Sequence, residues 1–65
     1  MTRKDYELIA EVLKNSSEIM DNISMAFLID NFAQELAKGN SLFNRDKFIN
    51  ACGADYSEVE YIINN

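Results

Sequence analysis

The residues of this chain that could do chemistry are mainly carboxylates. Glu7 and Glu11 are spaced to share one face of a predicted helix, and Asp30 and Gln34 share another. Paired carboxylates transfer protons or hold magnesium when a cleft shifts their pKa values. A chain of 65 residues has little room for a cleft. We therefore interpret these pairs as solvated helix faces.

Most other residues on which catalysis and metal binding depend are missing from the sequence. There is no histidine, and hence no common general base or partner for a nucleophile. The single cysteine, Cys52, follows a predicted helix, where the dipole disfavours a thiolate, and fits an inert core residue. Gly39 and Gly53 are too far apart to form a phosphate-binding loop. We expect no enzyme activity, no metal and no cofactor.

The clustered basic residues are Arg3, Lys4, Arg45 and Lys47. A helix that read DNA would present Arg45, Lys47 and Asn50, which is a small basic surface for that task. The net charge is −5, and the acidic residues are spread along the chain. This balance disfavours nucleic acid and anionic membranes, so direct contact with either is not expected.

Composition indicates one all-α domain covering residues 1–65. The chain is 48% apolar and has no proline and two glycines, too few turn residues for an all-β fold. One cysteine favours a reducing compartment, and the charged first residues contain no signal-peptide core, so we expect a cytoplasmic protein. The longest apolar run, residues 25–29, is far shorter than the about 20 residues of a membrane span.

Apolar spacing predicts two long helices in the first part of the chain. The first covers residues 3–15, and the second begins at Ser17 or Asp21 and runs to residue 38. The inward face of the first consists of Tyr6, Ile9, Ala10 and Leu13, widened by Leu8 and Val12. The main stripe of the second consists of Met25, Leu28, Ile29, Phe32, Ala33 and Leu36, beside a strip of Met20, Ile23 and Phe27. This wide surface predicts a central helix covered from two sides, with Phe32 as a buried anchor.

Residues 40–53, with the sequence NSLFNRDKFINACG, encode a short helix over residues 45–52. Asn44 is placed to cap its start, and Phe43 and Phe48 are spaced as a hydrophobic staple around that cap. Gly53 is placed to end the helix in the left-handed conformation. We expect Phe48 and Cys52, one turn apart, to face the core.

This segment resembles the N-P-R-F-D-R-x-R-F-L-x-A-C-G signature of a family of small proteins from bacteriophages, prophages and mobile elements. The matching positions are Asn40, Phe43, Arg45, Phe48, Ala51, Cys52 and Gly53. Ser41 and Leu42 replace the Pro-Arg pair of the family. The resemblance covers residues 3–53 and implies a small helical phage protein, but no particular activity.

A fourth helix is predicted over residues 56–63, opened by Asp55. We expect a partner protein to bind its surface at Asp55, Tyr56, Glu58, Glu60 and Tyr61. Tyrosine is enriched at interfaces, and a basic groove on a partner would attract the three acids, which have no basic residue among them. The alternative interpretation is a solvated last helix whose tyrosines lie at the margin of the core.

Together these features predict an all-α protein, a small bundle of three helices plus a short C-terminal fourth. The function we expect is binding without catalysis. A phage or mobile-element protein of this kind would bind a larger host or defence-system protein, such as a CRISPR effector or RNA polymerase, and inhibit or redirect it. The alternatives are a nucleic-acid-binding regulator that uses the helix over residues 45–52 and a self-assembling structural subunit. The sequence also leaves a homodimer open.

Overall fold

The computed structural model describes residues 3–64, and every regular element within them is helical. The elements are α1 (Arg3–Ser16), the 3-10 turn η1 (Ser17–Ile19), α2 (Asn22–Lys38), α3 (Arg45–Ala51) and α4 (Tyr56–Asn64). The prediction of an all-α fold is confirmed. The helix ends lie within one or two residues of those predicted from the sequence, with one exception. The alternative start of the second helix at Ser17 is wrong, because Ser17–Ile19 form the separate 3-10 turn and α2 begins at Asn22.

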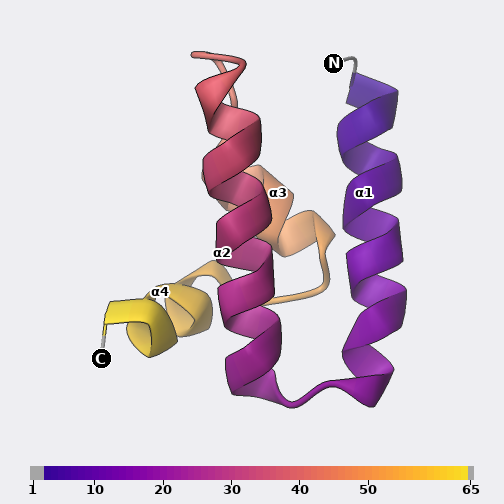
Figure 1. The fold of residues 1–65 in the computed structure, drawn as a ribbon, viewed down its shortest axis with the longest axis vertical. Helices are drawn as coiled ribbons and strands as arrows, with labels where there is room; N and C mark the ends of the chain where they lie inside the picture. Colours follow the sequence, from indigo (N-terminus) through magenta and orange to yellow (C-terminus); the bar gives the residue numbers. More distant parts are fainter. Residues whose placement is uncertain (1–2, 65) are drawn as a thin grey trace.

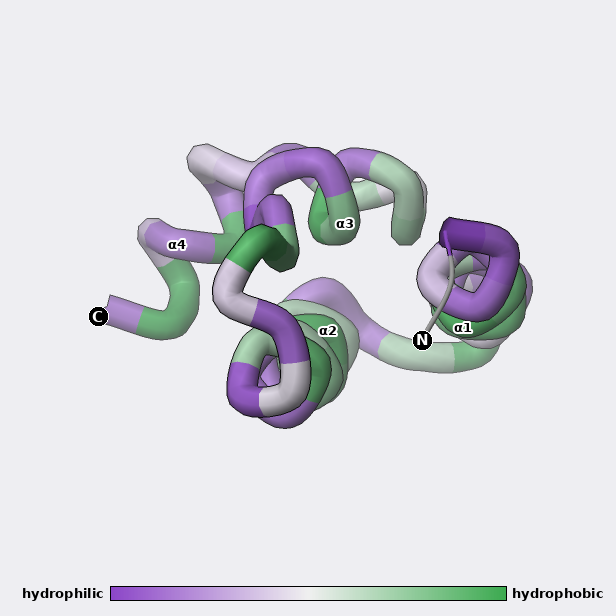
Figure 2. Tube along the Cα trace, turned by 90° about the horizontal axis from the view of Figure 1, so that it is seen from above, coloured by the Kyte–Doolittle hydropathy of each residue, from purple (hydrophilic) through white to green (hydrophobic). Residues whose placement is uncertain are grey.

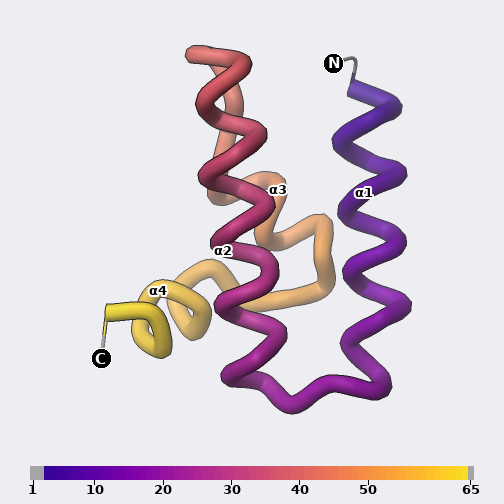
Figure 3. The backbone as a smooth tube through the Cα atoms, in the orientation of Figure 1, coloured from indigo at the N-terminus to yellow at the C-terminus, as the bar shows by residue number. Residues whose placement is uncertain are grey.

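The shortest α-helix, α3, packs against each of the other three α-helices. α1 and α2 run in opposite directions, and α3 lies behind them in Figure 1. The chain descends from the end of α2 to reach α3 and then crosses to α4 (Figure 3). α3 packs against α1, α2 and α4, whereas α2 packs mainly against α3 and α4. The central position predicted for the second helix is therefore shared with a helix of seven residues.

Local hydrogen bonds set the helix starts. The Asp21 side chain accepts from the backbone N–H of Ser24 at 2.7 Å, which identifies Asp21 as the cap of α2 and lowers its pKa. The Asn44 side chain accepts from the backbone N–H of Lys47 at 3.0 Å and caps α3, as predicted. Gly53 follows α3 with a φ of +80°, the left-handed conformation expected of it.

One hydrophobic core joins the four helices. Its buried residues are Ala10, Leu13, Met25, Ala26, Ile29, Ala33, Phe48, Ile49, Cys52 and Val59. Phe48 is 4% exposed, and its ring centroid lies 5.5 Å from that of Phe43, so the predicted staple is present. Cys52 is also buried, as predicted.

Several apolar side chains predicted to face the core lie on the surface instead. Phe32 is 37% exposed, so the prediction that it is a buried anchor is wrong. Leu8, Val12, Ile23 and Phe27 are more exposed still. The reason is that α3 and α4 cover one side of α1 and α2 only. Phe32 precedes the buried Ala33 by one position and is therefore turned from it by about 100° around the helix.

Candidate protein-binding surface

The five residues predicted to bind a partner lie on α4 or directly before it, and their environments differ. Asp55 is exposed, and its side chain accepts from the backbone N–H of Ser57 at 2.8 Å, which helps to start the helix. Tyr56 is half-buried and packs against the core. Glu58 and Tyr61 lie exposed, Tyr61 to 70%. The structure thus brings Glu58 and Tyr61 to the outer surface and gives Asp55 and Tyr56 structural contacts.

The remaining residue, Glu60, belongs to an ion cluster between three helices. Arg45 Nη2 lies 2.6 Å from Asp30 Oδ1 and 2.8 Å from Glu60 Oε1. The side chains of Arg45 and Glu60 are 29% and 28% exposed, and Asp30 is buried. Glu60 thus has a basic partner from α3, although no basic residue lies within residues 55–63. The interpretation of Asp30 and Gln34 as a solvated helix face is wrong for Asp30, which is buried and bonded to both Gln34 and Arg45.

The two carboxylates favour the charged form of Arg45. Burial by itself lowers the pKa of Arg45, but hydrogen bonds and charges from Glu60 and Asp30 outweigh it and raise the pKa overall. A bidentate guanidinium suits two carboxylates better than an ammonium would. Arg45 therefore fixes the start of α3 to α2 and α4. Sequence reasoning missed the cluster because Arg45 is 15 residues from each partner.

The same contacts reduce the basic surface on which the nucleic-acid alternative depends. Arg45 is held by two carboxylates. The Asn50 side chain donates to Asp46 Oδ1 at 2.9 Å and accepts from the backbone N–H of Tyr56 at 3.4 Å. Of the three residues that would read DNA, this leaves Lys47 to contact a phosphate. A helix with one available cation is a weak ligand for a polyanion.

An apolar surface on α1 is the feature that sequence reasoning missed. Leu8 and Val12 are 62% and 56% exposed and lie one turn apart, so they share a face of the helix. Each is two positions from the buried Ala10, which turns it about 160° away from the core. Hydrophobic segments of α1 lie along the edge turned away from α3 (Figure 2). Their offset from the Ala10 stripe is the sequence signal that could have identified them.

A second apolar pair lies on α2. Ile23 and Phe27 are also one turn apart and are 61% and 45% exposed. Single exposed apolar side chains are normal on soluble proteins, whereas large contiguous apolar patches mark interaction sites. Both long helices therefore carry an outward-facing apolar pair in addition to their core face.

Cys52 gives the structure no reactive group. The thiol is buried beneath α3, and burial raises its pKa to about 11. It is therefore protonated at neutral pH, the inert state of a cysteine. Among residues 3–64, no group of three histidine, cysteine or acidic side chains is arranged to hold a metal ion.

No helix among the described residues is long and apolar enough to cross a membrane. Comparison with family models, with curated proteins and with solved structures finds no match for this chain. The resemblance of residues 40–53 to a phage family therefore stays a prediction.

Proposed function

We propose that this protein is a non-catalytic accessory protein of a bacteriophage or mobile element, which binds a larger host or defence-system protein and inhibits or redirects it. Its place of action would be the cytoplasm of an infected or lysogenic bacterium. The observation that carries the proposal is the exposed apolar pair of Leu8 and Val12 on α1. The family resemblance supplies the biological setting.

Exposed apolar side chains are informative in a chain this small. Burying one leucine or valine side chain contributes about 1.5–3 kcal/mol, which this fold does not obtain from Leu8 or Val12. The surface of the protein measures 4652 Å². A standard interface covers about 800 Å² on each partner, or about one sixth of that surface. One face of α1 and its neighbours would be enough to hold a partner.

The acidic balance of the chain suits a partner with a basic surface. The net charge is −5, and complementary charges mainly raise the rate of encounter. Glu58 and Tyr61 on the outer side of α4 form a second proposed contact region, in which the acid steers the partner and the tyrosine anchors it.

Affinity capture with matched variants tests the proposal. The tagged protein is produced in its source organism as the parent, as Leu8→Gln/Val12→Gln, as Glu58→Gln/Tyr61→Ala and as a control. The control is Glu35→Gln/Lys38→Gln, which changes two exposed residues near the end of α2 and keeps the net charge. We expect the parent and control to retain a protein that the Leu8/Val12 variant loses. Adding purified parent to that protein should then inhibit or alter its activity.

The outcome that would contradict the proposal is the same set of captured proteins for all four chains, each shown by circular dichroism to be folded. A shift of random duplex DNA at low salt, lost on raising the salt, would favour the nucleic-acid regulator instead.

A further inference from the structure

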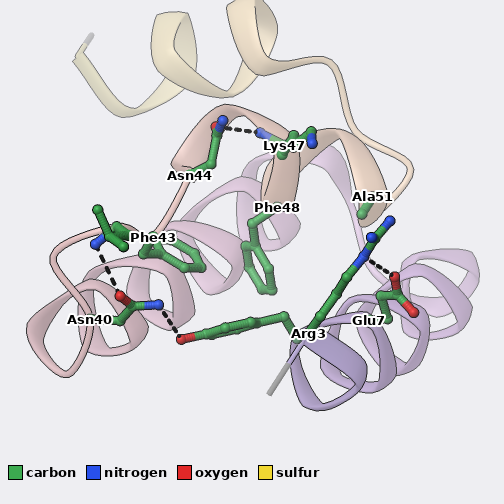
Figure 4. Close-up of a pocket in the computed structure, with 10 residues that line it drawn as sticks. Arg3, Glu7, Asn40, Phe43, Asn44, Lys47, Phe48 and Ala51 are labelled. Atoms are coloured by element: carbon green, nitrogen blue, oxygen red, sulfur yellow. Dashed lines mark hydrogen bonds and ion pairs between the residues drawn. The ribbon is translucent and has the colours of Figure 1, made fainter. Parts of the chain in front are cut away.

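A pocket opens between the start of α1, the loop before α3 and α3 itself (Figure 4). Its volume is about 460 Å³, within the range of about 300–1,000 Å³ that is typical of ligand sites. Arg3 and Glu7 line it from α1, and Lys47 and Ala51 line it from α3. It is separate from the Leu8–Val12 pair and from α4.

Aromatic rings form the floor of this pocket. The ring centroids of Tyr6 and Phe43 are 5.4 Å apart, and those of Phe43 and Phe48 are 5.5 Å apart, in tilted arrangements. Asn40 Nδ2 donates to Tyr6 Oη at 3.1 Å, while Asn40 Oδ1 accepts from the backbone N–H of Leu42 at 3.0 Å. These contacts hold the loop against α1, so the floor is formed before any ligand arrives.

The rim is basic in an otherwise acidic protein. Glu7 is the one acidic residue of the pocket lining, beside the two cations Arg3 and Lys47. Arg3 Nε pairs with Glu7 Oε1 at 3.0 Å, whereas Lys47 makes no ion pair within residues 3–64. The lining therefore carries a net charge of +1, against −5 for the chain. Leu42, 88% exposed, adds an apolar edge.

We propose that this pocket binds a segment of a protein partner in which an aromatic side chain stands next to a carboxylate. The aromatic ring packs on the half-buried Tyr6 and Phe43 rings, for which tilted ring contacts are favourable. The carboxylate accepts from the Lys47 ammonium, with Arg3 close by. The proposal rests on the proposed function only in that the partner is a protein.

Charge argues for a peptide over a nucleic acid at this pocket. A stacked base with its phosphate would also combine a ring and an anion. However, a nucleic acid brings a row of phosphates, and this surface offers one unpaired lysine in a chain of charge −5. A single carboxylate matches the single unpaired cation.

A titration followed by ¹⁵N–¹H NMR tests the assignment on the whole chain. The probes are N-acetyl-phenylalanine, its neutral amide, N-acetyl-alanine and adenosine monophosphate. We expect saturable shifts of the Phe43, Lys47 and Ala51 amides with N-acetyl-phenylalanine. The neutral amide should bind about two- to five-fold more weakly, as an exposed ion pair predicts. N-acetyl-alanine should cause no saturable shift.

The variant Lys47→Gln separates binding of the carboxylate from packing of the aromatic ring. The Lys47 side chain lies at the surface, so this substitution should leave the fold unchanged. The ratio of the affinities for N-acetyl-phenylalanine and for its neutral amide should fall to about one. Lys38→Gln, which removes a lysine outside the pocket, should keep the preference. Binding of N-acetyl-alanine or adenosine monophosphate as strong as that of N-acetyl-phenylalanine, or the absence of saturable shifts at the pocket, would overturn the assignment. Capture of a partner through Leu8 and Val12 would then still stand by itself.

Discussion

In residues 40–53, nearly every distinctive side chain is engaged by another part of the chain, whereas the outer side of α1 leaves large apolar side chains in solvent. Asn40 bonds to Tyr6, Asn44 caps α3 and Arg45 holds two carboxylates. Leu8 and Val12 have no comparable role in the fold. The contrast teaches that most side chains of the distinctive segment stabilise the fold, while the exposed apolar pair of α1 lies in a part of the sequence without a motif.

Most positions that match the phage-family signature have structural roles in this protein. Its matching positions Phe48, Cys52 and Gly53 pack or turn the chain, which is consistent with a motif that implies no activity. Ser41 and Leu42, where the sequence departs from the signature, are both exposed. Leu42 lies at the edge of the pocket. One of the two departures, Leu42, is therefore located where a ligand in the pocket would contact it.

The largest expected effect on stability is the difference between two phenylalanine substitutions, one in the core and one on the surface. Phe48→Ala removes a ring that is 4% exposed and should cost about 3–5 kcal/mol of unfolding free energy. Phe32→Ala, at 37% exposed, should cost much less. Urea unfolding followed by circular dichroism measures both. Equal losses of unfolding free energy in the two variants would contradict the distinction between residues 40–53, which stabilise the fold, and the outer surface of the long helices.

The ion cluster should matter more than any exposed ion pair. Arg45→Gln leaves the buried Asp30 without its cation and should cost about 2–3 kcal/mol. Asp30→Asn in the same chain should restore part of the loss. Arg3→Gln breaks the exposed pair with Glu7 and should change stability by less than about 1 kcal/mol. A similar effect of both arginine variants would contradict the structural role of Arg45.

The raised pKa of Cys52 predicts that the folded protein loses stability in alkaline solution. Its folded pKa of about 11 lies above the ordinary value of 9.0, so its contribution is complete below pH 9 and declines as the pH rises towards 11. The decline should total about 2–3 kcal/mol relative to Cys52→Ala, measured by urea unfolding at each pH. Native protein should also resist a thiol reagent at neutral pH. Rapid labelling without unfolding would place the thiol at the surface.

The two glycines offer a smaller, matched comparison. Gly53→Ala places a side chain at a φ of +80° with its Cβ 3.1 Å from Lys14 Cγ, and should cost about 1–2 kcal/mol. Gly39 has a φ of −91° and open space around it, so Gly39→Ala should be neutral or stabilise by up to about 1 kcal/mol. Thermal melts of the two variants should shift in opposite directions or differ clearly in size.

The smallest expected effect concerns the outer surface. Leu8→Gln/Val12→Gln should change the unfolding free energy by about 0.5 kcal/mol or less, because both side chains are already in solvent. The same variant should lose the captured partner. A strong loss of stability would mean that this face packs within the fold and is no binding surface.

Local sequence determined the helices of this protein and most of their ends. The cap of α3 at Asn44, the staple of Phe43 on Phe48 and the stop at Gly53 act across a few residues. Such contacts form as soon as a helix forms, so spacing alone predicts them. The buried positions of Phe48 and Cys52 follow because both lie on the single apolar side of a short helix.

Only the tertiary structure decided which long-helix side chains are exposed and where the pocket opens. Arg45 reaches Asp30 and Glu60 across 15 residues each, and Asn40 reaches Tyr6 across 34. Leu8 and Phe32 have the same apolar character as their buried neighbours, so residue type by itself could not tell which side chains would be covered. That depended on a seven-residue helix, α3, packing against one side of α1 and α2 and leaving their other sides in water.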